Sequence, residues 1–186
     1  NTNKDQDDVY GRELVALCQQ SLEAVRVCCT HDTEEFVDEE RYGDMLPAVA
    51  GLLTASATVF GKDEDGEADG EDDVPTGHRG FVHGYVTPCM VSLALCVSKD
   101  TLWKPLAHHV LMATRHPRGA VRLASLHTLH QLFVEVGEEF LVLLPECLPF
   151  LSELLEDESS DVADLTSKVV RYIEELSGEK LDQYLQ

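Results

Sequence analysis

The sequence has few basic residues and no long hydrophobic run, and both shortages limit its class. Fourteen Lys and Arg stand against 35 Asp and Glu, a formal net charge of −21. A negative field repels phosphates at long range, so the surface as a whole is unsuited to nucleic acid or anionic membranes. The longest apolar stretch, residues 89–97, is far shorter than the ~20 residues of a membrane helix. We therefore expect a soluble intracellular protein that contacts RNA, if at all, only locally.

The chain also lacks targeting and disulfide signals. It starts in a polar run without an initiator Met and without a signal-peptide pattern, so we expect a piece of a longer protein. The cysteines do not have the regular spacing of a disulfide framework, and most fall at apolar positions of expected helices. We expect reduced thiols at all six: Cys18, Cys28, Cys29, Cys89, Cys96 and Cys147.

Motifs of catalysis are missing as well. There is no GxSxG elbow and no Cys-His pair at a recognisable spacing, and the glycine-rich run at residues 77–84 lacks the GxGxxG order. Cys28, Cys29 and His31 lie close together without a second half that would complete four zinc ligands. His127 and His130 share a helix face without a nearby carboxylate. We predict no catalytic, cofactor or metal residues, and keep a small metal- or thiol-dependent enzyme as an alternative.

Apolar residues recur at helical spacing along most of the chain, which predicts about seven helices and no sheet, an all-α fold. A stretch from residue 61 is acidic, interrupted by glycine and almost free of apolar residues, so burial cannot offset its ordering entropy. The expected organisation is a polar linker (1–8), an N-terminal helical pair (9–60), an acidic flexible loop (61–80) and C-terminal repeats with a terminal cap (81–186).

The last two helical hairpins repeat one pattern. A shift of 41 positions places Val121 on Val162, Val110 on Leu151, and Leu132 on Ile173. This period lies within the ~40–47 residues of HEAT and armadillo units, whose hairpins stack into an α-solenoid because one hairpin cannot bury its own apolar face. We expect antiparallel helix pairs stacked in order.

Basic residues are concentrated in one part of this acidic chain. Residues 76–134 hold six basic residues and one acidic residue, a local charge of +5. Arg115, Arg118 and Arg122 surround one turn, and with Lys104 they form a hypothetical docking edge for RNA phosphate or an acidic protein segment. The alternative is that these side chains pair with acidic groups of the same chain.

Residues 87–186 closely resemble the C-terminus of a known family. The most specific motifs are LWKPL at 102–106, LLPE with PFLSELLEDE within 143–158, and GEKLDQYL at 178–185. They resemble the large nucleolar HEAT-repeat protein of the small-subunit processome. The resemblance implies a non-catalytic scaffold in the nucleolus that binds other processome proteins and pre-ribosomal or small nucleolar RNA. It implies no cofactor, membrane or small-molecule substrate. A HEAT adaptor of another complex, such as a transport receptor or phosphatase scaffold, is the alternative.

The turns depart from the HEAT pattern at two positions. A HEAT turn normally carries an Asp and an Arg whose hydrogen bonds link neighbouring units. Arg122 matches, but His116 stands where an Asp is usual. In the last unit Asp157 is kept and Ala163 replaces the Arg, as suits a terminal repeat with no following neighbour.

Overall fold

The computed structural model describes residues 2–60, 77–97, 99–181 and 183–185, and within them it has helices and no strand. The helical segments are α1 (Thr2–Thr30), α2 (Glu39–Val59), α3 (Gly77–Phe81), η1 (Val82–Val86), α4 (Thr87–Val97), α5 (Asp100–Ala113), α6 (Gly119–Val136), η2 (Gly137–Leu143), α7 (Leu144–Leu155) and α8 (Ser160–Ser177). Because α3, η1 and α4 are continuous and η2 leads directly into α7, the described residues form seven helical rods. The all-α prediction is confirmed.

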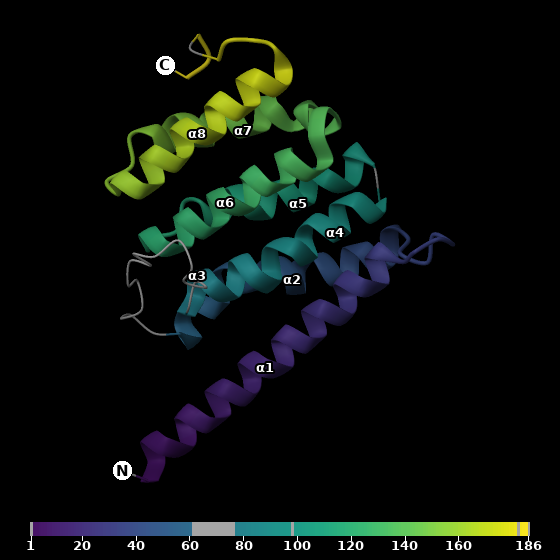
Figure 1. The fold of residues 1–186 in the computed structure, drawn as a ribbon, viewed down its shortest axis with the longest axis vertical. Coiled ribbons are helices and arrows are strands. Elements are labelled where there is room, and N and C mark those ends of the chain that lie inside the picture. Colours follow the sequence, from purple (N-terminus) through teal and green to yellow (C-terminus); the bar gives the residue numbers. More distant parts are fainter. Residues whose placement is uncertain (1, 61–76, 98, 182, 186) are drawn as a thin grey trace.

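The helices form two layers (Figure 1). In the first layer α1 packs on α4, α4 on α6, and α6 on α8. In the second layer, behind it, α2 packs on α5, and α5 packs on η2, which leads into α7. Each second-layer helix also packs on a first-layer partner, in the pairs α2–α4, α5–α6 and α7–α8. This ordered stack of antiparallel pairs confirms the predicted HEAT-type solenoid.

The 41-residue shift seen in the sequence is also a structural period. Val121 and Val162, at equivalent positions of α6 and α8, are both fully buried. The hydroxyls of Thr87 and Thr128, which are 41 residues apart on α4 and α6, share a buried hydrogen bond of 2.8 Å. Equivalent positions of neighbouring units therefore face one another across the stack, which is what a repeat architecture requires.

Two buried aromatic residues link the first unit, α2 with α4, to the second, α5 with α6. The hydroxyl of Tyr42 on α2 donates to the carbonyl of Leu102 on α5 at 2.9 Å, and the indole N–H of Trp103 donates to the carbonyl of Ala94 on α4 at 2.8 Å. Each places a large apolar ring in the core, worth roughly 1.5–3 kcal/mol, while its polar atom is satisfied. The second unit is therefore held against the first by burial and by hydrogen bonds.

The continuous helix Gly77–Val97 is long and apolar enough to cross a membrane by length and composition. It packs against α1, α2 and α6, and its side chains Val82, Val86, Met90 and Leu93 are fully buried in the protein core. The central helix of a stacked helical fold has the same composition. Burial within the protein therefore explains its hydrophobicity.

This helix runs through Thr87 without a break. Thr followed by Pro is typical of a helix start, but Thr87 has helical φ and ψ, and its N–H donates to the carbonyl of Val82. Pro88 has no N–H and its ring would crowd the carbonyl of Gly84 in a regular helix. The wider π turn of η1 accommodates this crowding, so the helix continues through the proline.

The first helix begins earlier than expected. α1 starts at Thr2, so the polar linker predicted over residues 1–8 is wrong for residues 2–8. Those residues contain neither proline nor glycine, and polarity alone does not prevent a helix. The acidic loop predicted over residues 61–80 is wrong for residues 77–80, because α3 begins at Gly77. Residues 61–76 of that loop lie outside the described residues.

The second helix begins only at Glu39, after a turn that starts at Asp32. The carboxylate of Asp32 accepts the N–H groups of Phe36 and Val37 at 2.9 and 2.7 Å. This local turn competes with a helix, which starts only after Asp38, whose side chain caps it. Phe36 lies in this turn, ahead of the helix, and is 64% exposed.

Candidate functional site at the turn edge

Two short turns lie on the same side of the stack and form what we call the turn edge, residues 114–118 between α5 and α6 and residues 156–159 between α7 and α8. The described connections at the opposite ends of the helices are residues 31–38, Lys99 and η2 (Figure 1). Arg115 and Arg118 belong to the turn edge, and Arg122, in the first turn of α6, reaches it with its side chain.

Arg122 connects the two turns. Its guanidinium donates to both carboxylate oxygens of Asp157 at 2.7 and 2.8 Å, and to Glu158 at 3.2 Å. It also donates to the carbonyls of His116 and Pro117 at 3.1 Å. The side chains of Arg122 and Asp157 are only 9% and 8% exposed, and their hydrogen bonds hold the pKa of Asp157 below its ordinary value. This is the link between units that the HEAT pattern predicts, and it buries Arg122.

His116 takes over part of the role of the missing Asp. Its Nδ1 accepts the N–H of Arg118 at 3.1 Å, as the Oδ1 of Asp157 accepts the N–H of Ser159 at 2.8 Å, 41 residues later. An accepting Nδ1 belongs to a neutral imidazole, and burial together with Arg118 lowers the pKa of His116. The histidine therefore closes the turn without the negative charge that could pair with an arginine of the preceding unit.

Arg115 and Arg118 also have partners within the chain. The Arg115 guanidinium forms two hydrogen bonds to the carboxylate of Glu153 on α7, at 2.8 and 2.5 Å, and lies 4.1 Å from the ring centre of Phe150. Arg118 donates to the carbonyl of Ala57 near the end of α2. Both arginines thus connect neighbouring units, and Arg115 does so by pairing with an acidic side chain of the same chain, which is the kind of contact that the alternative interpretation expected.

Lys104 does not lie with the arginines. It is near the start of α5, eleven residues before Arg115 and roughly 16 Å away along the helix axis at ~1.5 Å per residue. Its ammonium group lies 3.6 Å from a carboxylate oxygen of Glu146. The docking edge proposed from the sequence is therefore divided between two sides of the stack.

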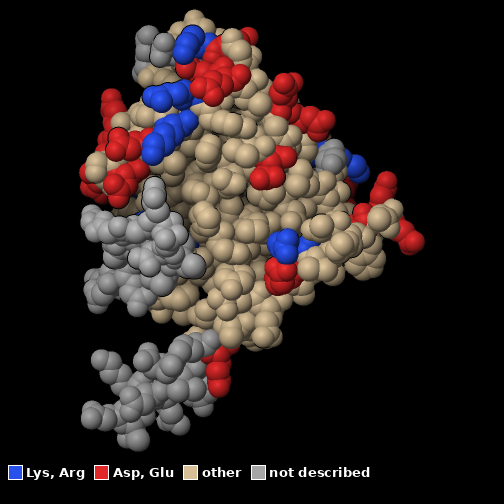
Figure 2. Space-filling view, in the orientation of Figure 1, with Lys and Arg blue, Asp and Glu red and all other residues tan. Residues whose placement is uncertain are grey.

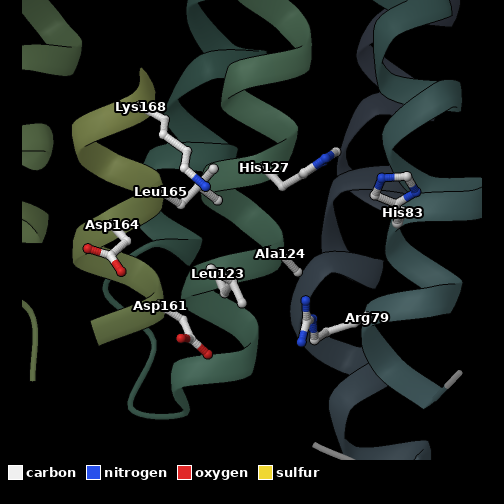
Figure 3. A pocket seen from close by; sticks show the side chains of 9 residues that line it. All are labelled: Arg79, His83, Leu123, Ala124, His127, Asp161, Asp164, Leu165 and Lys168. Atoms are coloured by element: carbon white, nitrogen blue, oxygen red, sulfur yellow. The ribbon is translucent and has the colours of Figure 1, made fainter. Parts of the chain in front are cut away.

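A hollow of about 350 Å³ lies between α3–η1, α6 and α8 in the first layer (Figure 3). It is lined by Arg79, His83, Leu123, Ala124, His127, Asp161, Asp164, Leu165 and Lys168. Figure 2 looks onto this layer, where charged side chains gather towards the α7–α8 end and the middle is largely uncharged. The described lining residues include both cations and carboxylates, and none of them is a Ser, Thr or Cys that could act as a nucleophile.

His127 is the chemically unusual residue of the hollow. Its ring lies 4.3 Å from that of His83, and burial, followed by the charges of His83, His130 and Arg79, lowers its pKa to about 4. It is neutral at pH 7, and its buried Nδ1 has no hydrogen-bond partner in the structure. The sequence grouped His127 with His130, but the ring of His130 packs on Tyr172 instead. Sequence spacing gave no signal for the pairing with His83, which depends on how η1 and α6 pack.

The thiols do not form a reactive site. Burial raises the pKa of Cys29 to about 11 and of Cys89 to about 12, so both are protonated at neutral pH, the opposite of a nucleophilic cysteine. The neighbouring Cys28 is exposed, and therefore faces away from Cys29. In the described ranges no group of three or more His, Cys, Asp or Glu side chains is placed to hold a metal ion.

Known proteins resemble the chain over nearly its whole length. It is 34% identical over 166 residues to the HEAT repeat-containing protein 1 homolog of Dictyostelium discoideum, covering 88% of this chain and 7% of the relative. It is 30% identical over 168 residues to HEAT repeat-containing protein 1 of Danio rerio, covering 90% of this chain and 7% of the relative. No protein-family model matches the chain.

A third relative is more similar over a shorter stretch. The U3 small nucleolar RNA-associated protein 10 of Aspergillus oryzae is 52% identical over 64 residues, 34% of this chain and 4% of the relative. The chain thus spans less than a tenth of the length of each of these three relatives. These matches confirm the resemblance seen in the sequence motifs, and the chain corresponds to one segment of the protein family named HEAT repeat-containing protein 1 and U3 small nucleolar RNA-associated protein 10.

Proposed function

We propose that the chain is part of a non-catalytic scaffold of the small-subunit processome, acting in the nucleolus to support the transcription and processing of pre-ribosomal RNA. The observation that carries this proposal is its similarity, over 88% of its length, to a relative named for HEAT repeats, together with a shorter match to a relative named for association with U3 small nucleolar RNA. The stacked helices agree with it, because a solenoid presents an extended surface to partners.

The chemistry of the hollow and of the thiols supports a scaffold over an enzyme. Asp161 and Lys168 lie at the exposed rim of the hollow, His127 is neutral and lacks a partner, and the buried thiols are protonated. A nucleophile needs a neighbour that activates it. The carboxylate of Asp32 lies 3.6 Å from the Sγ of Cys96, but the pKa of that thiol is raised to about 12, chiefly by burial, so the contact does not give a reactive thiolate. Binding to other proteins and to RNA is the role that remains.

Affinity purification tests the proposal. The full-length protein that carries this segment is tagged and isolated from nucleolar extract, and a form without the segment serves as the control. We expect the full-length protein to enrich U3 small nucleolar RNA, pre-ribosomal RNA and other processome proteins, and deletion of the segment to reduce that enrichment. Enrichment of transport cargo or phosphatase subunits in place of these RNAs would contradict the proposal.

Docking of RNA phosphate or an acidic segment at Lys104, Arg115, Arg118 and Arg122 stays a prediction. The exposure of each side chain in its ion pair determines which residues are suitable for a test. Arg122 is buried, so its replacement would perturb the fold along with any docking. Lys104 and Arg115 are 54% and 45% exposed and suit the test. If the docking edge binds RNA, Arg115→Gln and Lys104→Gln lower crosslinking to RNA, whereas Lys99→Gln, on an equally exposed lysine outside the proposed edge, leaves it unchanged.

A further inference from the structure

The end of the stack formed by α1 and α2 has an open apolar groove. It has a volume of about 280 Å³ and is lined mainly by aliphatic side chains of both helices, with Ser21 as the polar member and no charged residue. Leu17 on one wall is 61% exposed, and Leu14, one turn earlier on the same helix, is 51% exposed. Such a concentration of exposed apolar groups on an otherwise highly charged chain marks a contact surface.

The exposed face of α2 shows the same feature independently. From Met45 to Phe60 the chain has no charged residue, although 26% of all its residues are charged. Yet Ala48, Gly51 and Ala55 on this stretch are exposed. A surface helix normally carries charge on its solvent face, and a helix that is uncharged all round is usually buried. The other second-layer helices follow that rule, since Lys104 on α5 and the two glutamates Glu146 and Glu153 on α7 are exposed and charged.

The order of the stack indicates what covers this groove. Every first-layer helix from α4 onward has a second-layer partner, in the pairs α2–α4, α5–α6 and α7–α8. α1 belongs to the first layer through its packing on α4 (Figure 1). Its second-layer position, beside α2, is the groove. The small side chains of Ala48 and Gly51 would let a helix backbone approach closely.

We propose that the groove between α1 and α2 binds the second-layer helix of one further HEAT unit, located ahead of α1 in the polypeptide. The occupant is an amphipathic helix with apolar residues at i, i+3 or i+4, and i+7, which pack against Leu17, Cys18, Met45 and Leu52. The relatives support this choice over a second copy of the chain, because the matched region is 7% of their length and most of their sequence lies outside it. The inference does not depend on the role in the processome.

Two cysteines of α1 provide an internal comparison for the test. Cys18 lies in the groove, and Cys28 is exposed outside it. The rate of thiol alkylation at both is measured by mass spectrometry in the 186-residue chain and in a form extended ahead of α1 by one unit of the natural polypeptide, 41 residues by the period of the last two units. We expect the extension to slow alkylation of Cys18 at least tenfold and to leave that of Cys28 unchanged. Equal rates for Cys18 in both forms would overturn the proposal.

A matched pair of substitutions gives a second readout. Leu17→Glu places a charge in the groove, and Met112→Glu places one at a 48% exposed position of α5 outside it. We expect Leu17→Glu to lower the Tm of the extended form much more than that of the 186-residue chain, and Met112→Glu to change both by the same small amount. Three results together would show that the occupant is a second copy of the chain and that the proposal is wrong. The 186-residue chain would form a dimer in sedimentation, Leu17→Glu would make it monomeric, and the extension would leave Cys18 as reactive as before.

Discussion

The two ends of the stack differ in how completely neighbouring helices bury each other's apolar side chains. Between α5–α6 and α7–α8 the core is continuous, Val121 and Val162 are fully buried, and the Arg122–Asp157 pair closes the turn edge. At the α1–α2 end, leucines of α1 remain half or more exposed beside an apolar groove. Both ends have the same helical periodicity, so apolar pattern alone does not determine burial. What differs is whether a second-layer helix is present on each side.

Breaking the buried ion pair should have the largest effect. Arg122→Met removes the guanidinium and leaves the carboxylate of Asp157 buried at 8% exposure with one backbone N–H as partner. Loss of one partner of a buried pair costs roughly 3–5 kcal/mol, because the remaining charge is uncompensated. We expect a loss of that order in the free energy of unfolding, measured by urea denaturation. The double variant Arg122→Met with Asp157→Leu should recover much of it, and a double variant as unstable as the single one would contradict the role assigned to the pair.

Two leucines of α1 allow a comparison between the side of the helix that packs on the core and the side that lies at the groove. Leu22 is 4% exposed and packs into the core, whereas Leu17, five residues earlier, is 61% exposed. Leu22→Ala should cost roughly 2–3 kcal/mol of unfolding free energy, because it removes buried methyl groups and leaves a cavity. Leu17→Ala in the same chain should change stability by no more than about 0.5 kcal/mol. Similar losses in the two variants would show that the groove is closed in solution.

Acidification should weaken the stack through His127. Its folded pKa is about 4 against an ordinary value of 6.5, so between these values the unfolded chain takes up a proton that the folded chain does not. Stability should therefore be complete above about pH 7, fall as the pH drops from 6.5 to 4, and lose nothing more from this group below that. Denaturation of the His127→Leu variant at pH 8 and pH 5 should show a smaller difference than the original chain. Leu123→Ala in the same hollow is the control and should keep the original difference.

The smallest expected effect concerns the exposed pair of Lys104 and Glu146 at 3.6 Å. Both side chains are about half exposed, so solvent and salt screen their attraction. Lys104→Gln should change the free energy of unfolding by less than about 1 kcal/mol, the range of surface pairs. Measurement in 0.05 M and 1 M salt should show that even this difference shrinks at high salt. A loss as large as that of Arg122→Met would mean that the pair is part of a network absent from the structure.

Periodicity was sufficient to predict most of the fold. The 41-residue shift identified the equivalent valines Val121 and Val162, which are both buried. α6 and α8 each end at a glycine, Gly137 and Gly178, with positive φ values of 75° and 73° that glycine adopts without strain. Helix starts were less predictable, because they depend on local competition. Hydrogen bonds to the carboxylate of Asp32 form a turn in place of the first turn of α2. The π turn before Pro88 lets the helix continue through a Thr-Pro sequence that is typical of a helix start.

The candidate site could be predicted in part. The sequence identified Arg122 and Asp157 as turn residues of the HEAT pattern, and the structure joins them. It could not separate Lys104 from the arginines, since that requires knowing which end of α5 lies at which side of the stack. It also could not pair His127 with His83, because these residues meet only through the packing of α6 on η1. Long-range side-chain contacts of this kind leave no local signal.

Native-state hydrogen exchange measures the contrast between the two ends most directly. Amides of α6 lie in the closed part of the stack, so we expect them to exchange only through global unfolding and to report the full free energy of unfolding. Amides in the middle of α1, which has no second-layer partner among the described helices, should exchange through a separate local opening at clearly lower free energy. Equal protection of α1 and α6 in the 186-residue chain would contradict the open end that the structure describes.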